Sequence, residues 1–411
     1  MNTNTKKLHD LGQSLWVDKI SREMLVNGTL ALYIAEWSLT GLTSNPTIFE
    51  HAIGHGSFYD EAIVRLARRG ESAEKLFFSL AMEDLKGAAD LFRPVFEATD
   101  GLDGWVSLEV SPLLADKAAE TIVAAASLHE AADRPNLFIK IPGTPEGIPA
   151  IEESIFAGVP VNVTLLFSCR HYIAAAEAYL RAIERRIAAG LDPRIASVAS
   201  LFVSRWDKAV SDTLPVEQRK QVDTARARRI YRVDRDAGVD AQIAAVMAMA
   251  DSRSDAAVGD GVPADLRNRL GIAMAQRTYR AYRALLASPR WRKLAAAGAR
   301  PQRLLWASTG TKDPLAADTL YVEALAAPDT INTMPEKTLH AFADHGQVRA
   351  TLPPDGGNAE AVLEEFRREG IDDEALALRL QREGADAFTA SWRVLLARIE
   401  EKSASLAGTV A

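Results

Sequence analysis

One lysine, Lys140, lies within the apolar segment NLFIKIPGT (136–144) and is well placed for nucleophilic chemistry. Side chains alternate between the two faces of a strand, so Lys140 would lie opposite Ile139 and Ile141. No acidic residue occurs within five positions. Burial without a carboxylate partner would lower the lysine pKa and supply a free amine. A structural interpretation, in which a strand-end lysine reaches solvent, fits this segment equally well.

Polar residues interrupt other apolar segments in a similar way. They are Glu109 in WVSLEVSP, Asn162 and Thr164 in PVNVTLLFS, and Asp18 in SLWVDKI. An inward-facing polar residue of a packed barrel is costly unless it binds another polar group or a ligand. With the segment of Lys140, four strands each carry such a residue toward the same end, which indicates an active site.

The elements that could position these residues are short apolar runs separated by alanine-rich amphipathic stretches. We predict eight strands, within 14–20, 38–46, 105–112, 136–144, 160–168, 195–205, 303–311 and 330–335, although the last run could equally be a loop. Helical patterns occupy 56–70, 72–98, 113–132, 145–157, 169–189 and 264–299. Strands that alternate with helices favour a parallel sheet, and eight such units predict an α/β fold of the (β/α)8 TIM-barrel type.

The chain of 411 residues is long enough for a barrel with insertions. We interpret 1–411 as a single barrel domain with a helical insertion at about 206–302 and a C-terminal helical extension at about 361–405. The basic stretch 219–235 within the insertion is interpreted as a solvated helix face, because its few aromatic residues argue against a nucleic-acid site.

Bulk composition limits the functional classes. Hydrophobic residues make up 48% and charged residues 25%, as in ordinary globular proteins, and the net charge of −7 argues against nucleic-acid or membrane-surface partners. The single cysteine, Cys169, excludes an intrachain disulfide and fits a reducing compartment. Neither a signal-like N-terminal segment nor a run of eighteen apolar residues occurs. We expect a cytoplasmic protein that is a monomer or homodimer.

The quoted segments resemble those of the transaldolase family across nearly the whole chain. The matching segments are GLTSNPTIF, VSLEVSP, IKIPGTPEGIPAIEE, VNVTLLFS, SLFVSRWD and LLWASTGTKDP. Their combination is highly specific, and the chain length resembles the longer branch of the family. The resemblance implies transfer of a dihydroxyacetone unit from sedoheptulose 7-phosphate or fructose 6-phosphate to glyceraldehyde 3-phosphate or erythrose 4-phosphate, in the pentose phosphate pathway.

The resemblance also implies roles for individual residues. Lys140 would form an imine with the C2 carbonyl, and Asp18 would take the proton of the C4 hydroxyl as the C3–C4 bond breaks. Glu109 and Thr164 would hold a water for proton transfer. Asn45, in TSNP, would hydrogen-bond the hydroxyls of the retained three-carbon unit.

Four further positions match substrate-binding residues of the family. Ser200 would contact the substrate, and Arg205 would bind its phosphate, because a planar guanidinium suits bidentate contact with an oxyanion. Compact members of the family carry an arginine shortly after the serine of the seventh-strand segment. Here Ser308 is followed by TGTK. We assign Ser308 and Lys312 to the phosphate, with a solvent-facing Lys312 as the alternative.

No cofactor or metal is expected, because an iminium itself provides the electron sink. STGTK lacks the GxxxxGK[ST] spacing of an NTPase, and His51 and His55 lie beside glycines that favour a loop over a metal-binding helix. The expected partners are small-molecule sugar phosphates. Two alternatives remain: an aldolase of the same fold that releases dihydroxyacetone to water, and a non-catalytic sugar-phosphate-binding barrel.

Overall fold

Eight parallel strands form the centre of the protein, for which a computed structural model describes residues 1–54, 56–211 and 266–409. The strands are β1 (Gln13–Asp18), β2 (Leu39–Thr43), β3 (Val106–Glu109), β4 (Leu137–Pro142), β5 (Val161–Leu166), β6 (Ser197–Phe202), β7 (Gln302–Ala307) and β8 (Thr330–Met334). They pair in the order β2-β1-β8-β7-β6-β5-β4-β3. A parallel bridge between Gly41 and Trp105 joins the two edges. The predicted (β/α)8 barrel is therefore confirmed, and the run at 330–335 contains a strand.

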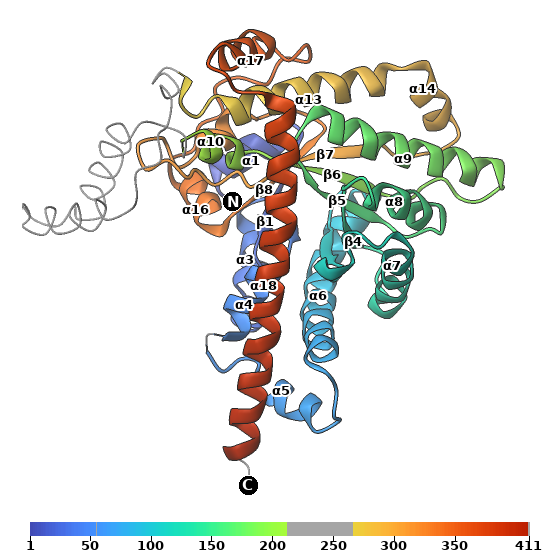
Figure 1. The fold of residues 1–411 in the computed structure, drawn as a ribbon, viewed down its shortest axis with the longest axis vertical. Helices are drawn as coiled ribbons and strands as arrows, with labels where there is room; N and C mark the ends of the chain where they lie inside the picture. The colour runs from blue at the N-terminus through green and yellow to red at the C-terminus, as the bar shows by residue number, and fades with distance from the viewer. Residues whose placement is uncertain (55, 212–265, 410–411) are drawn as a thin grey trace, which may run out of the picture.

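Helices surround this barrel (Figure 1). Before β7 they are α1 (Thr3–Asp10), α2 (Arg22–Val26), α3 (Thr29–Glu36), α4 (Pro46–Gly54), α5 (Asp60–Ala67), α6 (Ala73–Ala98), α7 (Ala118–Ala132), α8 (Gly147–Phe156), α9 (Cys169–Ala188), α10 (Ser204–Ser211), α13 (Leu270–Ala287) and α14 (Pro289–Ala296). After β7 come α15 (Leu320–Ala324), α16 (Glu336–His345), α17 (Ala359–Arg368) and α18 (Asp373–Thr409). Each predicted helical stretch contains a helix, and 264–299 contains two because Ser288 caps α14 and Pro289 begins it.

The amino end of the barrel is filled by large side chains. Alternation along the strands directs Trp16 and Phe138 to the same inner face as Asp18 and Lys140. The Trp16 and Phe138 ring centroids lie 6.2 Å apart. Gly41 makes room for this packing, since a β-carbon there would lie 2.5 Å from the Trp16 ring. Large side chains thus close one end of the barrel, and Asp18 and Lys140 lie toward the other.

The described segments outside the barrel repeat contain further helices. Within the expected insertion, α10, α13 and α14 are described, while the basic stretch 219–235 lies outside the described residues. Both helices expected near 361–405 are present as α17 and α18. The long α18 crosses in front of the barrel and packs against α4, α5 and α6 (Figure 1). No helix of the described ranges is both long and apolar enough to cross a membrane.

Candidate active site

A cavity of about 120 Å³ opens at the carboxyl ends of the strands. Eight of the nine residues to which the family resemblance assigns a role line it: Asp18, Asn45, Lys140, Thr164, Ser200, Arg205, Ser308 and Lys312. The ninth, Glu109, lies next to Lys140. Residues that are far apart in the chain therefore meet at one place because parallel strands end at the same rim.

The Lys140 side chain is buried in the barrel and has two polar neighbours. Its Nζ donates to the Ser44 carbonyl oxygen at 3.1 Å and lies 3.5 Å from Glu109 Oε2. The expectation of a lysine without a carboxylate partner is therefore wrong. Parallel pairing places Glu109 of β3 directly beside Lys140 of β4, a neighbour that local sequence cannot reveal.

Two buried oxygens beside Lys140 make no hydrogen bond within the described residues: Glu109 Oε1 and Thr164 Oγ1. Burial raises the pKa of Glu109, although the positive charge of Lys140 acts in the opposite direction. A buried oxygen without a partner costs free energy, so both atoms are suited to accept a hydrogen bond from a water or ligand.

Asp18 ends β1 at the rim of the cavity, where it retains some solvent exposure. Its Oδ1 accepts a hydrogen bond of 2.7 Å from Thr43 Oγ1, and that hydroxyl lies 2.7 Å from Thr333 Oγ1. Burial raises the pKa of Asp18. The charge of Lys140 and the hydrogen bond from Thr43 oppose this rise, and so do the charges of Lys312 and Arg205. The carboxyl group is therefore held in place and made more basic than a solvated aspartate.

Three polar residues form a hydrogen-bonded chain inside the barrel. Ser200 Oγ donates to Asn162 Oδ1 at 2.7 Å, and Asn162 Nδ2 donates to Ser107 Oγ at 3.1 Å. All three side chains are buried. Asn162 thus serves its neighbours, and Ser200 reaches the cavity with its hydroxyl orientation set by that chain.

Asn45 lies two residues after the end of β2 and directly before α4. Its Oδ1 accepts a hydrogen bond from the Ile48 backbone N–H at 3.1 Å, and Pro46 is the first residue of the helix. Proline suits this position because the first helical N–H has no partner within the helix. The cap orients the Asn45 side chain at the cavity and leaves its Nδ2 group able to donate to a ligand.

Two basic groups besides Lys140 line the cavity. Arg205 lies in the first turn of α10, and Lys312 lies on the loop after β7 at the exposed rim. Burial is the main cause that lowers the pKa of both groups, and the charge of Arg205 adds to the effect on Lys312. The Ser308 hydroxyl lies 3.1 Å from that of Ser204 at the start of α10. Two cations, a hydroxyl and a helix N-terminus together favour an anion.

Six residues that line the cavity were not singled out from the sequence: Thr43, Phe202, Ala307, Thr333, Pro335 and Phe388. Thr43 and Phe202 lie inside the quoted segments GLTSNPTIF and SLFVSRWD, where inward alternation could have identified them. Phe388 belongs to α18, far beyond the last strand, and nothing in its local pattern connects it to the barrel.

Within the described ranges, no cluster of three or more His, Cys, Asp or Glu side chains could hold a metal ion. The cavity instead offers a buried amine, two carboxyl groups, hydroxyls and two cations. This set is suited to covalent carbonyl chemistry on an anionic substrate.

Comparison with known proteins matches this arrangement to one family. The sequence profile of the Transaldolase/Fructose-6-phosphate aldolase family matches residues 15–399. A protein named Transaldolase from Parafrankia sp. (strain EAN1pec) is 41% identical over 408 residues, which cover 98% of this chain and all of the relative. One of the same name from Thermobifida fusca (strain YX) is 42% identical over 414 residues, with the same coverage of both chains. A third, from Acidothermus cellulolyticus, is 42% identical and covers 96% of this chain and 95% of its own.

Proposed function

The chain belongs to the transaldolase/fructose-6-phosphate aldolase family, and from this premise we propose how its residues carry out the reaction. It is a transaldolase, an enzyme that transfers a ketone-bearing unit between sugar phosphates. The observation that carries the proposal is that one cavity is lined by the buried amine of Lys140, the carboxyl group of Asp18 and the guanidinium of Arg205.

The first step forms an imine at Lys140. Its Nζ attacks the C2 carbonyl of a ketose phosphate to give a carbinolamine, which then loses water. Each stage moves protons between nitrogen and oxygen. Glu109 Oε2 lies 3.5 Å from Nζ, and the unpartnered Glu109 Oε1 and Thr164 Oγ1 are suited to hold a water between them. We assign proton transfer during imine formation to Glu109, Thr164 and this water.

The second step breaks the C3–C4 bond. Asp18 accepts the C4 hydroxyl proton while the bonding electrons move into the iminium at Lys140, and the aldose phosphate leaves. The enamine of the retained three-carbon unit then attacks the acceptor aldehyde, and Asp18 returns its proton to the new hydroxyl. The raised pKa of Asp18 supports this role, because a carboxyl group whose pKa is nearer to neutral pH both accepts and returns a proton readily.

The remaining residues hold the substrate. The amide of Asn45 and the hydroxyl of Ser200 are assigned to the hydroxyls of the three-carbon unit, which lies nearest Lys140. Arg205, with Ser308 and Lys312, is assigned to the phosphate group, since these residues form the basic side of the cavity. Binding the phosphate at a fixed distance from Lys140 aligns C2 for attack.

Chemical trapping tests the proposal. The enzyme is incubated with fructose 6-phosphate and reduced with borohydride, and the modified peptide is located by mass spectrometry. We expect a reduced three-carbon adduct on Lys140, and no adduct or turnover in Lys140→Ala. Lys312→Ala is the matched control, because it removes the other lysine that lines the cavity and should leave the adduct on Lys140. An adduct on Lys312, or none, contradicts the mechanism.

Dependence on the acceptor tests transfer against release. With fructose 6-phosphate as donor, we expect steady formation of glyceraldehyde 3-phosphate only when erythrose 4-phosphate is added. Turnover that is unaffected by the acceptor would show that dihydroxyacetone is released to water instead.

A further inference from the structure

The C-terminal helix α18 is fastened to the barrel at the rim of the active site. The buried Gln381 donates through Nε2 to the carbonyl oxygens of Gly143 at 3.0 Å and Leu165 at 2.9 Å. Gly143 directly follows β4, and Leu165 directly follows Thr164 in β5. One side chain of α18 therefore holds the ends of the two strands that carry Lys140 and Thr164.

One turn further along, Gly384 brings the helix backbone close to the phosphate side of the cavity. A β-carbon at this position would lie 2.9 Å from Leu165 Cδ2 and 3.2 Å from Arg205 Nη1. Glycine weakens a helix interior by about 1 kcal/mol relative to alanine, but here it permits a close approach that a side chain would obstruct. The surface of α18 thus packs directly on the guanidinium group.

Phe388 lies one further turn along the same face, seven residues after Gln381. Its side chain is buried and lines the active-site cavity. The ring centroid lies 5.9 Å from Lys140 Nζ and 5.9 Å from Arg205 Cζ. The aromatic ring is therefore equally distant from the amine and from the guanidinium, and forms an apolar part of the cavity wall near both.

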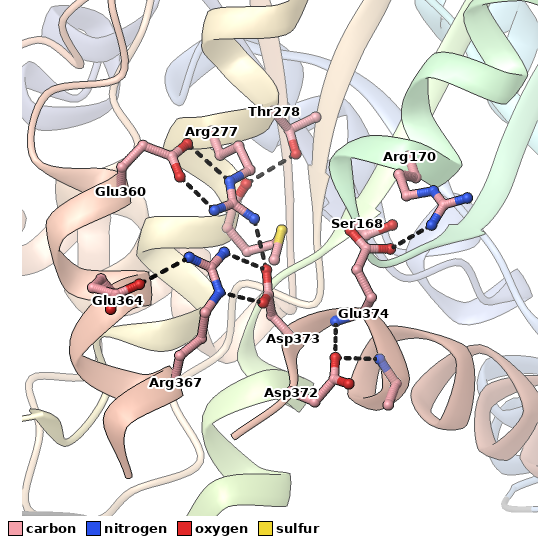
Figure 2. Close-up of polar contacts among 12 residues, drawn as sticks. Ser168, Arg170, Arg277, Thr278, Glu360, Glu364, Arg367, Asp372, Asp373 and Glu374 are labelled. Carbon is pink, nitrogen blue, oxygen red and sulfur yellow. Dashed lines mark hydrogen bonds and ion pairs between the residues drawn. The ribbon is translucent and has the colours of Figure 1, made fainter. Parts of the chain in front are cut away.

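Ion pairs tie the start of α18 to its neighbours (Figure 2). Asp373 accepts hydrogen bonds from Arg277 Nη1 at 2.6 Å and Arg367 Nε at 3.0 Å, which belong to α13 and α17. Near the other end, Lys402 Nζ lies 2.7 Å from Asp60 Oδ1. Contacts on both sides of Phe388 thus hold the helix against the barrel, and the ring has a defined place in the cavity.

We propose that Phe388 is a specificity-determining residue, whose ring contacts the carbon chain of the substrate between the imine carbon and the phosphate. This inference rests on the proposed roles of Lys140 and Arg205. A ketose phosphate held at both ends must place its intervening carbons beside the ring. A longer chain held at the same two points has to bow outward, and the ring occupies that space. Phe388 therefore favours shorter over longer donors.

Substitutions that change the size of this wall test the inference. We measure kcat/KM for fructose 6-phosphate and for sedoheptulose 7-phosphate, whose chain has one more carbon between C2 and the phosphate. Phe388→Leu should raise the ratio of the heptulose to the hexulose value at least threefold, and Phe388→Trp should lower it. If Phe388→Leu does not fold, Phe388→Met takes its place, because methionine retains more of the buried volume. It should change the ratio in the same direction.

Phe366→Leu is the matched control, because Phe366 is a buried phenylalanine of the same hydrophobic cluster that does not line the cavity. Its ratio should equal that of the wild type. An unchanged ratio in the folded Phe388 variants overturns the inference. Borohydride trapping separates a failure of the proposed function from a failure of the role of Phe388. If the wild type forms no adduct on Lys140, the proposed function fails. With that adduct present and the ratio unchanged, only the role of Phe388 fails.

Discussion

The Thr43 hydroxyl gives a direct test of Asp18 as the proton-transfer group. Thr43 Oγ1 donates a hydrogen bond of 2.7 Å to Asp18 Oδ1 and is one of the causes that lower the Asp18 pKa. Thr43→Val keeps the shape of the side chain and removes this donor. Because the hydrogen bond stabilises the carboxylate form, its loss raises the Asp18 pKa further above the ordinary aspartate value.

The size of the effect follows from the strength of the bond. A hydrogen bond to a charged group contributes about 1.5–3 kcal/mol, so its loss should lower kcat/KM roughly 10- to 100-fold at a pH on the acidic limb. Cleavage of the donor requires ionised Asp18. The acidic limb of the kcat/KM profile should therefore move to higher pH, and the loss of rate should be smaller at pH values above the limb.

The assay is the pH dependence of kcat/KM for fructose 6-phosphate with saturating acceptor. Thr333→Val is the matched control, because Thr333 Oγ1 lies 2.7 Å from the Thr43 hydroxyl and makes no hydrogen bond to Asp18 in the described structure. It should shift the limb much less. An acidic limb that stays in place in Thr43→Val, or that moves equally in both variants, would refute Asp18 as the group that titrates.

Two further predictions concern the phosphate and the stability of the fold. Arg205→Ala should lower kcat/KM for phosphorylated donors roughly 10- to 100-fold, mainly through KM, because it removes a charge-assisted contact. An equal loss on a non-phosphorylated ketose would contradict the assignment. Burial raises the pKa of Asp207 to about 6, although Tyr321 and two backbone N–H groups bind its carboxylate. Because the pKa of Asp207 is higher in the folded than in the unfolded state, its full contribution to stability is present below about pH 4. This contribution, up to about 3 kcal/mol, is lost as pH rises through 6. Asp207→Asn should abolish this pH dependence of the free energy of unfolding, measured by denaturant titration, and a dependence equal to that of the wild type would contradict the prediction.

Much of the fold could be predicted because a barrel is assembled from local units. Each strand run predicted from the sequence overlaps a strand of the structure, although β1 and β7 begin one residue before their runs, and the predicted stretch 72–98 agrees with α6 to within one residue. The runs extend past the strand ends, as 195–205 does beyond β6, because apolar residues continue into the rim loops. Short helices such as α2 and α15 were not predicted, since five residues carry too little periodicity.

The residues of the candidate site were identifiable because each interrupts an apolar strand or lies in a quoted family segment. Alternation determined which side chains share a face with Lys140, and the motifs predicted roles for them, which the experiments above test. The sequence by itself thus determined the barrel class, the family resemblance and the set of candidate polar residues.

Tertiary structure alone decided which groups are neighbours. Local sequence showed no acid near Lys140, whereas parallel pairing places Glu109 3.5 Å from its amine. Phe388 reaches the same cavity from a helix that follows the last strand, because Gln381 and Gly384 fasten α18 over the rim. Periodicity reports only the face on which a side chain lies, whereas the pKa of a carboxyl group and the wall of a cavity depend on distances between segments that are remote in the chain.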